Sequence, residues 1–152
     1  MKLAEALLLR ADCQKRMEQL KSRLIGSAKL QEGEVPPENP QKLLAEVEAV
    51  ADQLMDLIRH INRTNSTTPF VEGKSIADAL AERDVLLLRR GVYNDLATFA
   101  SVRQDRITRS EVKYISAVDV SETRKRADEL AKNYRELDAR IQELNWKTEL
   151  ID

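Results

Sequence analysis

Side chains that could bind a ligand gather in two segments of the sequence. The first runs from His60 to Asn65, where Asn62, Arg63 and Asn65 interrupt an otherwise apolar helical spacing. The second, residues 101–113, holds four basic side chains against two acidic ones. Arginine suits phosphate or carboxylate because its planar guanidinium donates paired hydrogen bonds. We interpret six side chains as a candidate anion site or subunit contact: Asn62, Arg63, Asn65, Arg103, Arg106 and Arg109.

Each segment also has a purely structural interpretation. Asn and Thr readily form turns, and Arg63 would complement the negative end of a helix dipole, so residues 60–65 could simply end a helix. The arginines of the second segment could pair with carboxylates such as Asp84 or Glu82, in the same subunit or in a neighbouring one. The sequence leaves these alternatives open.

Residue types and spacing give little support for catalysis. Neither GxxxxGK[ST] nor GxGxxG accompanies the arginines, so a nucleotide site would need an unfamiliar construction. One cysteine, Cys13, and one histidine, His60, cannot build a His/Cys zinc site. Leu57 stands three residues before His60, where the Glu-x-x-His pair of a di-iron bundle needs a glutamate. We predict that the protein is not an enzyme and uses no metal or cofactor.

Charge and hydropathy narrow the class of partner. The 152 residues include 25 basic and 26 acidic side chains, a net charge of −1, which lacks the basic footprint of a nucleic-acid binder. No apolar run exceeds four residues, against about 20 for a transmembrane helix. Glu5 interrupts the first apolar stretch and Arg10 and Asp12 close it, unlike a secretory signal. We therefore predict a cytoplasmic protein with no transmembrane segment and no nucleic-acid partner.

Apolar spacing predicts an all-α fold with four long helices at about residues 2–30, 40–65, 75–102 and 121–150. The prolines of the segment 31–39 separate the first two helices. Each helix has an apolar seam with three- and four-residue steps. The seams are Leu3, Ala6, Arg10, Cys13, Met17, Leu20 and Leu24; Leu44, Val47, Ala51, Leu54, Ile58, Ile61 and Asn65; Ile76, Leu80, Val85, Leu88, Val92, Leu96 and Phe99; and Ala127, Leu130, Tyr134, Leu137, Ile141 and Leu144.

Connections and charges suggest how these helices combine. Alternating residues with β-branched side chains predict a short strand at about 112–118, paired with residues 67–71 in a small two-stranded β element. Residues 1–30 carry seven basic and three acidic groups, whereas residues 31–58 carry one basic and seven acidic, so the first two helices should form an antiparallel coiled-coil hairpin. We predict one elongated antiparallel four-helix domain over residues 1–152.

Surplus apolar surface predicts association. Residues 85–88 are apolar around a full helical turn, which offers more surface than one thin bundle can cover. Trp146 lies off its seam and could add a subunit contact. We predict a homo-oligomer, with a protein partner as a further possibility, and favour a contact between the arginine segment and Asn62 and Arg63 of another subunit.

Several stretches resemble the septicolysin-like family of small bacterial helical proteins. They are residues 2–12, 61–65, 79–85, 109–114 and 134–138, together with Asn145 and Trp146. The resemblance covers nearly the whole chain and implies a cytolysin, but it assigns no catalytic or pore-forming residue. A secreted pore former should also show an export signal and a membrane-active segment. A self-assembling or partner-docking protein is therefore the leading hypothesis, and a cytolysin or a small anionic-ligand binder are the alternatives.

Overall fold

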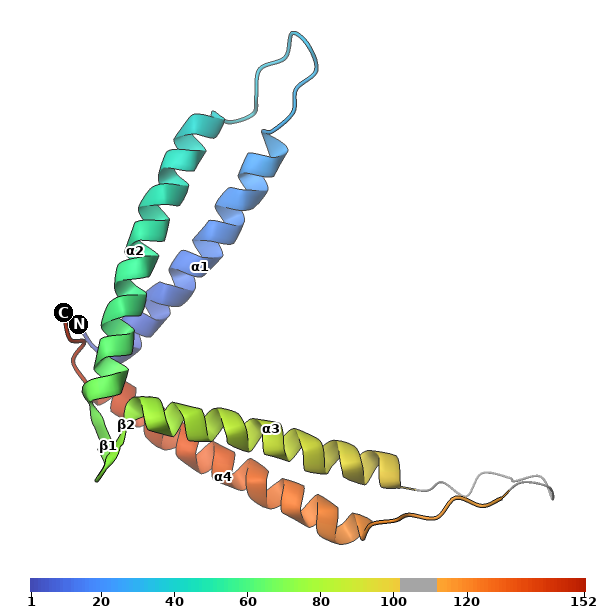
Figure 1. Cartoon of the computed structure of the whole chain (residues 1–152). Helices are drawn as coiled ribbons and strands as arrows, with labels where there is room; N and C mark the ends of the chain where they lie inside the picture. Colours follow the sequence, from blue (N-terminus) through green and yellow to red (C-terminus); the bar gives the residue numbers. More distant parts are fainter. Residues whose placement is uncertain (102–111) are drawn as a thin grey trace. The chain divides into compact units, whose positions relative to one another are not determined.

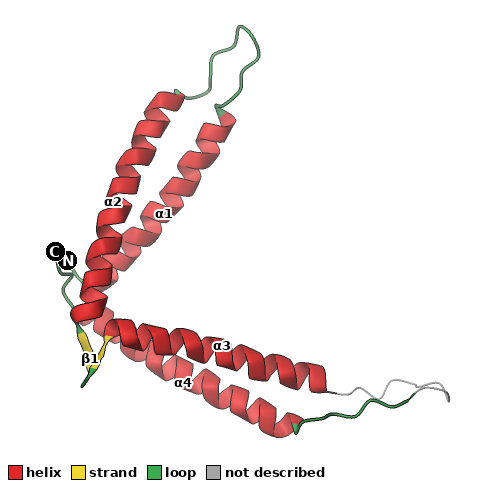
Figure 2. Ribbon diagram, viewed as in Figure 1, coloured by secondary structure: helices red, strands yellow, loops and turns green. Residues whose placement is uncertain are grey.

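The computed structural model describes residues 1–101 and 112–152. These residues form four α-helices, α1 (Leu3–Gly26), α2 (Pro40–Thr67), α3 (Ile76–Ala100) and α4 (Val120–Lys147). A small antiparallel sheet of β1 (Pro69–Val71) and β2 (Lys74–Ser75) lies between α2 and α3 in the chain (Figures 1 and 2). The predicted all-α fold with a small β element is confirmed.

Contacts divide the chain into two compact units. One comprises Met1–Ile76 together with Gln142–Asp152, and the other comprises Ala77–Ile141. Helix α4 contributes to both, because its last turns belong to the first unit. Our assignment of residues 1–152 to a single domain stays a prediction.

In the first unit, α1 and α2 run side by side in opposite directions (Figure 1). Four members of the predicted α1 seam are buried, namely Leu3, Ala6, Cys13 and Leu20. Opposite charges face each other across the hairpin, where Arg16 lies 3.8 Å from Glu46 and Arg23 binds Glu38. The seam of α1 and the charge pairing of the two helices therefore agree with the sequence, while supercoiling of the hairpin stays a prediction.

The buried face of α2 differs from the predicted seam. The side chains that it buries are Leu43, Val50, Leu57, Ile61 and Thr64. The predicted seam agrees with this face at Ile61. At Leu44, Ala51, Ile58 and Asn65 the structure instead buries the residue just before each of them, so one of the two predicted rows is displaced by one residue, about 100°. The error arises because two adjacent rows of α2 are both apolar over most of its length. The spacing alone cannot distinguish them.

Capping explains where these helices begin and end. Asn39 accepts a hydrogen bond from the Gln41 N–H at 2.9 Å, and Pro40 occupies the first helical position of α2. Helix α1 ends at Gly26, four residues before the predicted end. Helix α4 ends at Lys147 rather than near residue 150, because the following residues pair with the N-terminus: the Leu3 N–H donates to the Thr148 carbonyl at 2.9 Å.

The β element is present, but the strand predicted at 112–118 is wrong. Residues 112–116 have no regular secondary structure, and the partner of β1 is β2, which follows after a turn at Glu72 and Gly73. Gly73 takes a positive φ of 75°, which glycine adopts without steric cost. Closing a hairpin over a few residues loses less chain entropy than pairing segments more than 40 residues apart. The nearby strand β2 therefore pairs with β1 in place of residues 112–118.

In the second unit, α3 and α4 lie side by side (Figure 1). The predicted α4 seam is confirmed, since Ala127, Leu130, Leu137 and Ile141 are buried. Arg83 of α3 donates to the Asp138 carboxylate of α4 at 2.8 Å. Among the helices of the described residues, none is both long and apolar enough to cross a membrane.

Candidate functional site

Helix α3 carries two apolar faces, and only one of them is packed within the chain. Its buried residues are Ile76, Ala79, Leu86 and Ala97. A second row, which we name the outer stripe, consists of Val85, Leu88, Val92, Leu96 and Phe99, whose exposed fractions are 52, 70, 67, 43 and 91%. At about 100° per residue the two rows lie roughly 150° apart around the helix. The predicted seam of this helix is therefore wrong from Val85 onward, because those residues face outward.

The size and charge of the side chains on α3 determine which face of the helix points inward. Both rows of α3 satisfy helical spacing, but the buried row includes the small residues Ala79 and Ala97, which let a neighbouring helix approach closely. Arg83 lies on the same side as the buried row and reaches Asp138 of α4. The larger side chains are consequently left on the outer side of the helix.

Charged side chains border the outer stripe asymmetrically. From the helical geometry, Asp84 lies along one edge, Arg89 and Glu82 lie along the other, and Asp95 lies in the row of Leu88. Within its own chain Asp84 lies 3.8 Å from Arg83, whose shorter contact is with Asp138. The stripe is thus an apolar row with Asp95 beside Leu88 and Leu96, and with charges of both signs along its edges.

The C-terminal end of the outer stripe opens into a hollow of about 400 Å³. Leu96 and Phe99 line it together with residues 100–101 and 114–118. Tyr114 and Ile115 are 88% and 86% exposed, so the apolar surface continues from the helix onto this segment. Arg124 of α4 donates to the Ser101 hydroxyl at 3.1 Å, which ties the end of α3 to the start of α4.

The six predicted site residues are only partly described. Arg103, Arg106 and Arg109 lie outside the described residues. Asn62 and Arg63 are exposed near the C-terminal end of α2, and Asn65 is half-buried there. Arg63 donates to the main-chain carbonyl of Asp152 in its own chain. Arg63 therefore has a partner within its own chain, and the proposed contact between Asn62, Arg63 and the arginine segment stays a prediction.

A polar residue that the sequence analysis passed over is the most buried one in this region. Thr64 is fully buried; its hydroxyl donates to the His60 carbonyl at 2.7 Å and accepts from the Ile151 N–H at 2.9 Å. It therefore connects α2 to the C-terminal segment. A signal was present, because Thr64 continues the seven-residue step of Leu43, Val50 and Leu57.

The N-terminal residues pair with the same C-terminal segment. The Lys2 ammonium lies 2.5 Å and the Met1 amino group 3.3 Å from the Glu149 carboxylate. Both cations form hydrogen bonds to the ionised form of Glu149, and they therefore hold its pKa below the ordinary value. Lys2 makes the largest contribution. The Leu150 N–H also donates to the Met1 carbonyl at 2.8 Å. The contacts fasten the two ends of the described chain together.

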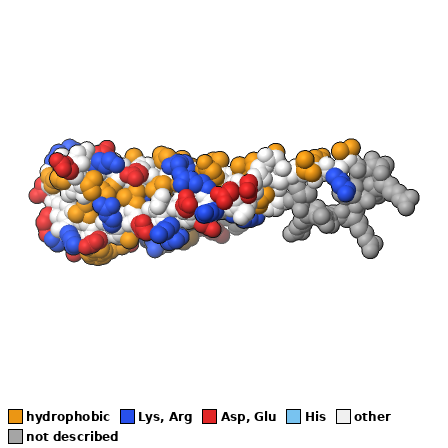
Figure 3. Space-filling view, turned by 90° about the horizontal axis from the view of Figure 1, so that it is seen from below, with side chains coloured by type: hydrophobic (Ala, Val, Ile, Leu, Met, Phe, Trp, Pro, Cys, Tyr) orange, Lys and Arg blue, Asp and Glu red, His pale blue; other side chains and the backbone are white. Residues whose placement is uncertain are grey.

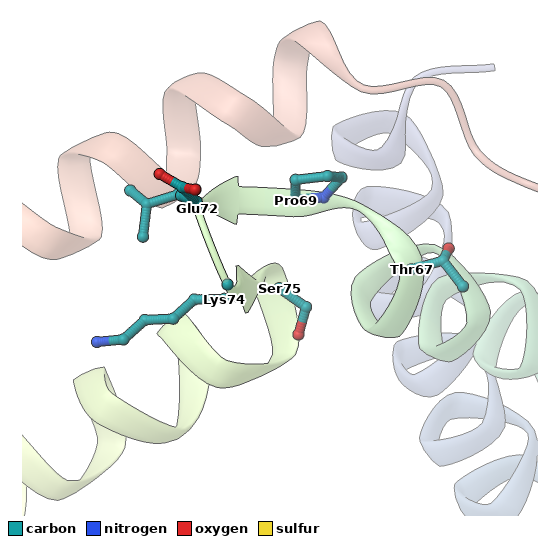
Figure 4. A pocket seen from close by; sticks show the side chains of 7 residues that line it. Thr67, Pro69, Glu72, Lys74 and Ser75 are labelled. Atoms are coloured by element: carbon teal, nitrogen blue, oxygen red, sulfur yellow. The ribbon is translucent and has the colours of Figure 1, made fainter.

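A second hollow, of about 440 Å³, lies at the β hairpin (Figure 4). Thr67, Pro69, Glu72, Lys74 and Ser75 are among its lining residues, and Figure 4 shows them spread around the open turn. Glu72 and Lys74 have opposite charges, so the hollow has no bias toward one ligand charge. In residues 1–101 and 112–152, no three His, Cys, Asp or Glu side chains are grouped to hold a metal ion.

Side chains of both charges are distributed over the visible surface (Figure 3). On the face shown in Figure 3, basic and acidic side chains are intermixed with apolar ones. The only cysteine in the sequence, Cys13, is buried in the α1 seam, which makes it a packing residue. Five large exposed apolar side chains in one row distinguish the outer stripe of α3 from an ordinary solvated helix face.

Fold and surface together define a small all-α protein with an apolar helix face left exposed. The chain belongs to DUF6847, a family of unknown function, whose model matches residues 10–150. It is similar over 99% of both chains to a crystal structure of a functionally unknown conserved protein from Corynebacterium diphtheriae, with 52% sequence identity and a TM-score of 0.93. Comparison with curated proteins finds no match.

These relationships correct the septicolysin-like resemblance. The matching family is one of unknown function, and the similar crystal structure is of a functionally unknown protein, so neither indicates a cytolysin. The short stretches that suggested the resemblance do not outweigh a family model that spans nearly the whole chain. The cytolysin expectation is therefore withdrawn.

Proposed function

We propose that this is a non-enzymatic assembly protein whose α3 outer stripe docks against another helix. The observation that supports the proposal is the row of five large, exposed apolar side chains on a helix whose other apolar face is already buried. Single exposed apolar residues are common on protein surfaces, but a contiguous row is typical of an interaction site. The balanced charge of the chain favours a protein partner over nucleic acid.

Energetics favour a partner that covers the whole stripe. Residues 85–99 span about 21 Å of helix. Burying one large apolar side chain completely contributes about 1.5–3 kcal/mol, whereas association costs at least about 4 kcal/mol in lost translation and rotation. One buried side chain cannot offset that cost, whereas five together exceed its lower bound. An extended helix is thus a better partner than a small ligand.

The proposal also includes a compartment and a view of the polar end of α2. We place the protein in the cytoplasm, where a buried free thiol such as that of Cys13 stays reduced. An anionic-ligand function at Asn62, Arg63 and Asn65 has no independent support among the described contacts, since Arg63 already binds the Asp152 carbonyl.

Light scattering of two matched variants tests the proposal. Leu88→Glu places a charge in the stripe at a side chain that is 70% exposed, and Ile25→Glu places one on α1 at a side chain that is 67% exposed. At about 10 μM, above the dissociation constant of an ordinary stable interface, we expect the parent and Ile25→Glu to have the same multimeric mass. Leu88→Glu should have the mass of one chain.

Circular dichroism should show equal helical content in all three proteins, because both substitutions are at exposed helical positions. A monomeric parent chain, or an equal loss of mass in both variants, would contradict assembly through the outer stripe.

A further inference from the structure

We draw no further inference here: the strongest candidate, the exposed apolar patch of Phe99, Tyr114 and Ile115 around the hollow at the C-terminal end of α3, carries nothing further, because nothing in the structure shows what covers it.

Discussion

Thr64 shows how a single polar residue can fasten two distant parts of the chain. Its hydroxyl both donates to a carbonyl of its own helix and accepts the Ile151 N–H. A buried hydroxyl is tolerated only when such bonds replace those it would make to water. Arg63, the next residue along α2, adds a bond to the Asp152 carbonyl. The polar end of α2 thus has a structural role that requires no ligand.

Thr64→Val should lower the free energy of unfolding by about 1–2 kcal/mol, because the shape is kept while the part-buried hydrogen bond from the Ile151 N–H is lost. Urea denaturation measures this change. Thr67→Val is the matched control: the Thr67 hydroxyl also bonds a carbonyl of its own helix, that of Arg63 at 2.8 Å, but it is exposed. Equal effects of the two substitutions would show that the contact with Ile151 contributes nothing.

Glu149 should titrate below the ordinary glutamate pKa of about 4.3. Because its pKa is lower in the folded than in the unfolded chain, its ionised form stabilises the fold above pH 4.3, and this contribution disappears as the pH falls through the folded-state pKa. Carboxyl-carbon NMR across pH 2–6 would give the midpoint. In Lys2→Gln the midpoint should rise, since the largest cause of the shift is removed; an unchanged midpoint would refute the assignment.

Helix α3 has two apolar faces, and tertiary contacts determine which of them is buried. Hydrophobic spacing alone would bury either of them. Arg83 favours the observed choice, because turning the outer stripe toward α4 would remove its guanidinium from Asp138. The small residues on the buried face then bring the two helices together, and the larger residues are left for an external partner.

Arg83→Met should therefore destabilise the pairing of α3 with α4. We expect a loss of about 1–2 kcal/mol in the free energy of unfolding, because a partly buried, charge-assisted hydrogen bond disappears while the aliphatic volume is retained. Thermal denaturation at fixed protein concentration would measure it. Arg90→Met, at an exposed position of the same helix, should cost much less. Comparable losses would mean that the Asp138 contact is unimportant.

For the whole molecule, the continuity of α4 has a thermodynamic consequence. Its residues up to Ile141 belong to one compact unit and those from Gln142 to the other. A helix forms cooperatively along its length, so melting one part of α4 disfavours the adjoining part. We therefore expect the two units to unfold together, as the predicted single domain would.

Unfolding in urea should consequently show one transition at a fixed protein concentration. Trp146 fluorescence reports on the first unit, and far-ultraviolet circular dichroism reports on the helices of both. We expect the two midpoints to coincide, as they do for a two-state domain. Two separate midpoints would indicate two independent domains.

The sequence by itself determined the four helices, the loop between α1 and α2, and the seams of α1 and α4. These features depend on signals that are local and repeated: apolar residues every three or four positions, prolines in the loop, and Asn39 followed by Pro40 at the start of α2. In α1 and α4 no second apolar row extends along the whole helix, so the pattern had a single solution.

Only the tertiary structure decided which face of α2 and of α3 is buried, which strand pairs with β1, and what Thr64 bonds to. In α2 two adjacent rows are apolar, and in α3 two nearly opposite rows are. Spacing shows that a row is apolar, but burial requires a neighbour, and the position of the neighbour depends on contacts such as Arg83 with Asp138 and Thr64 with Ile151 that join residues far apart in the chain. The outer stripe could be recognised only once that neighbour was in place.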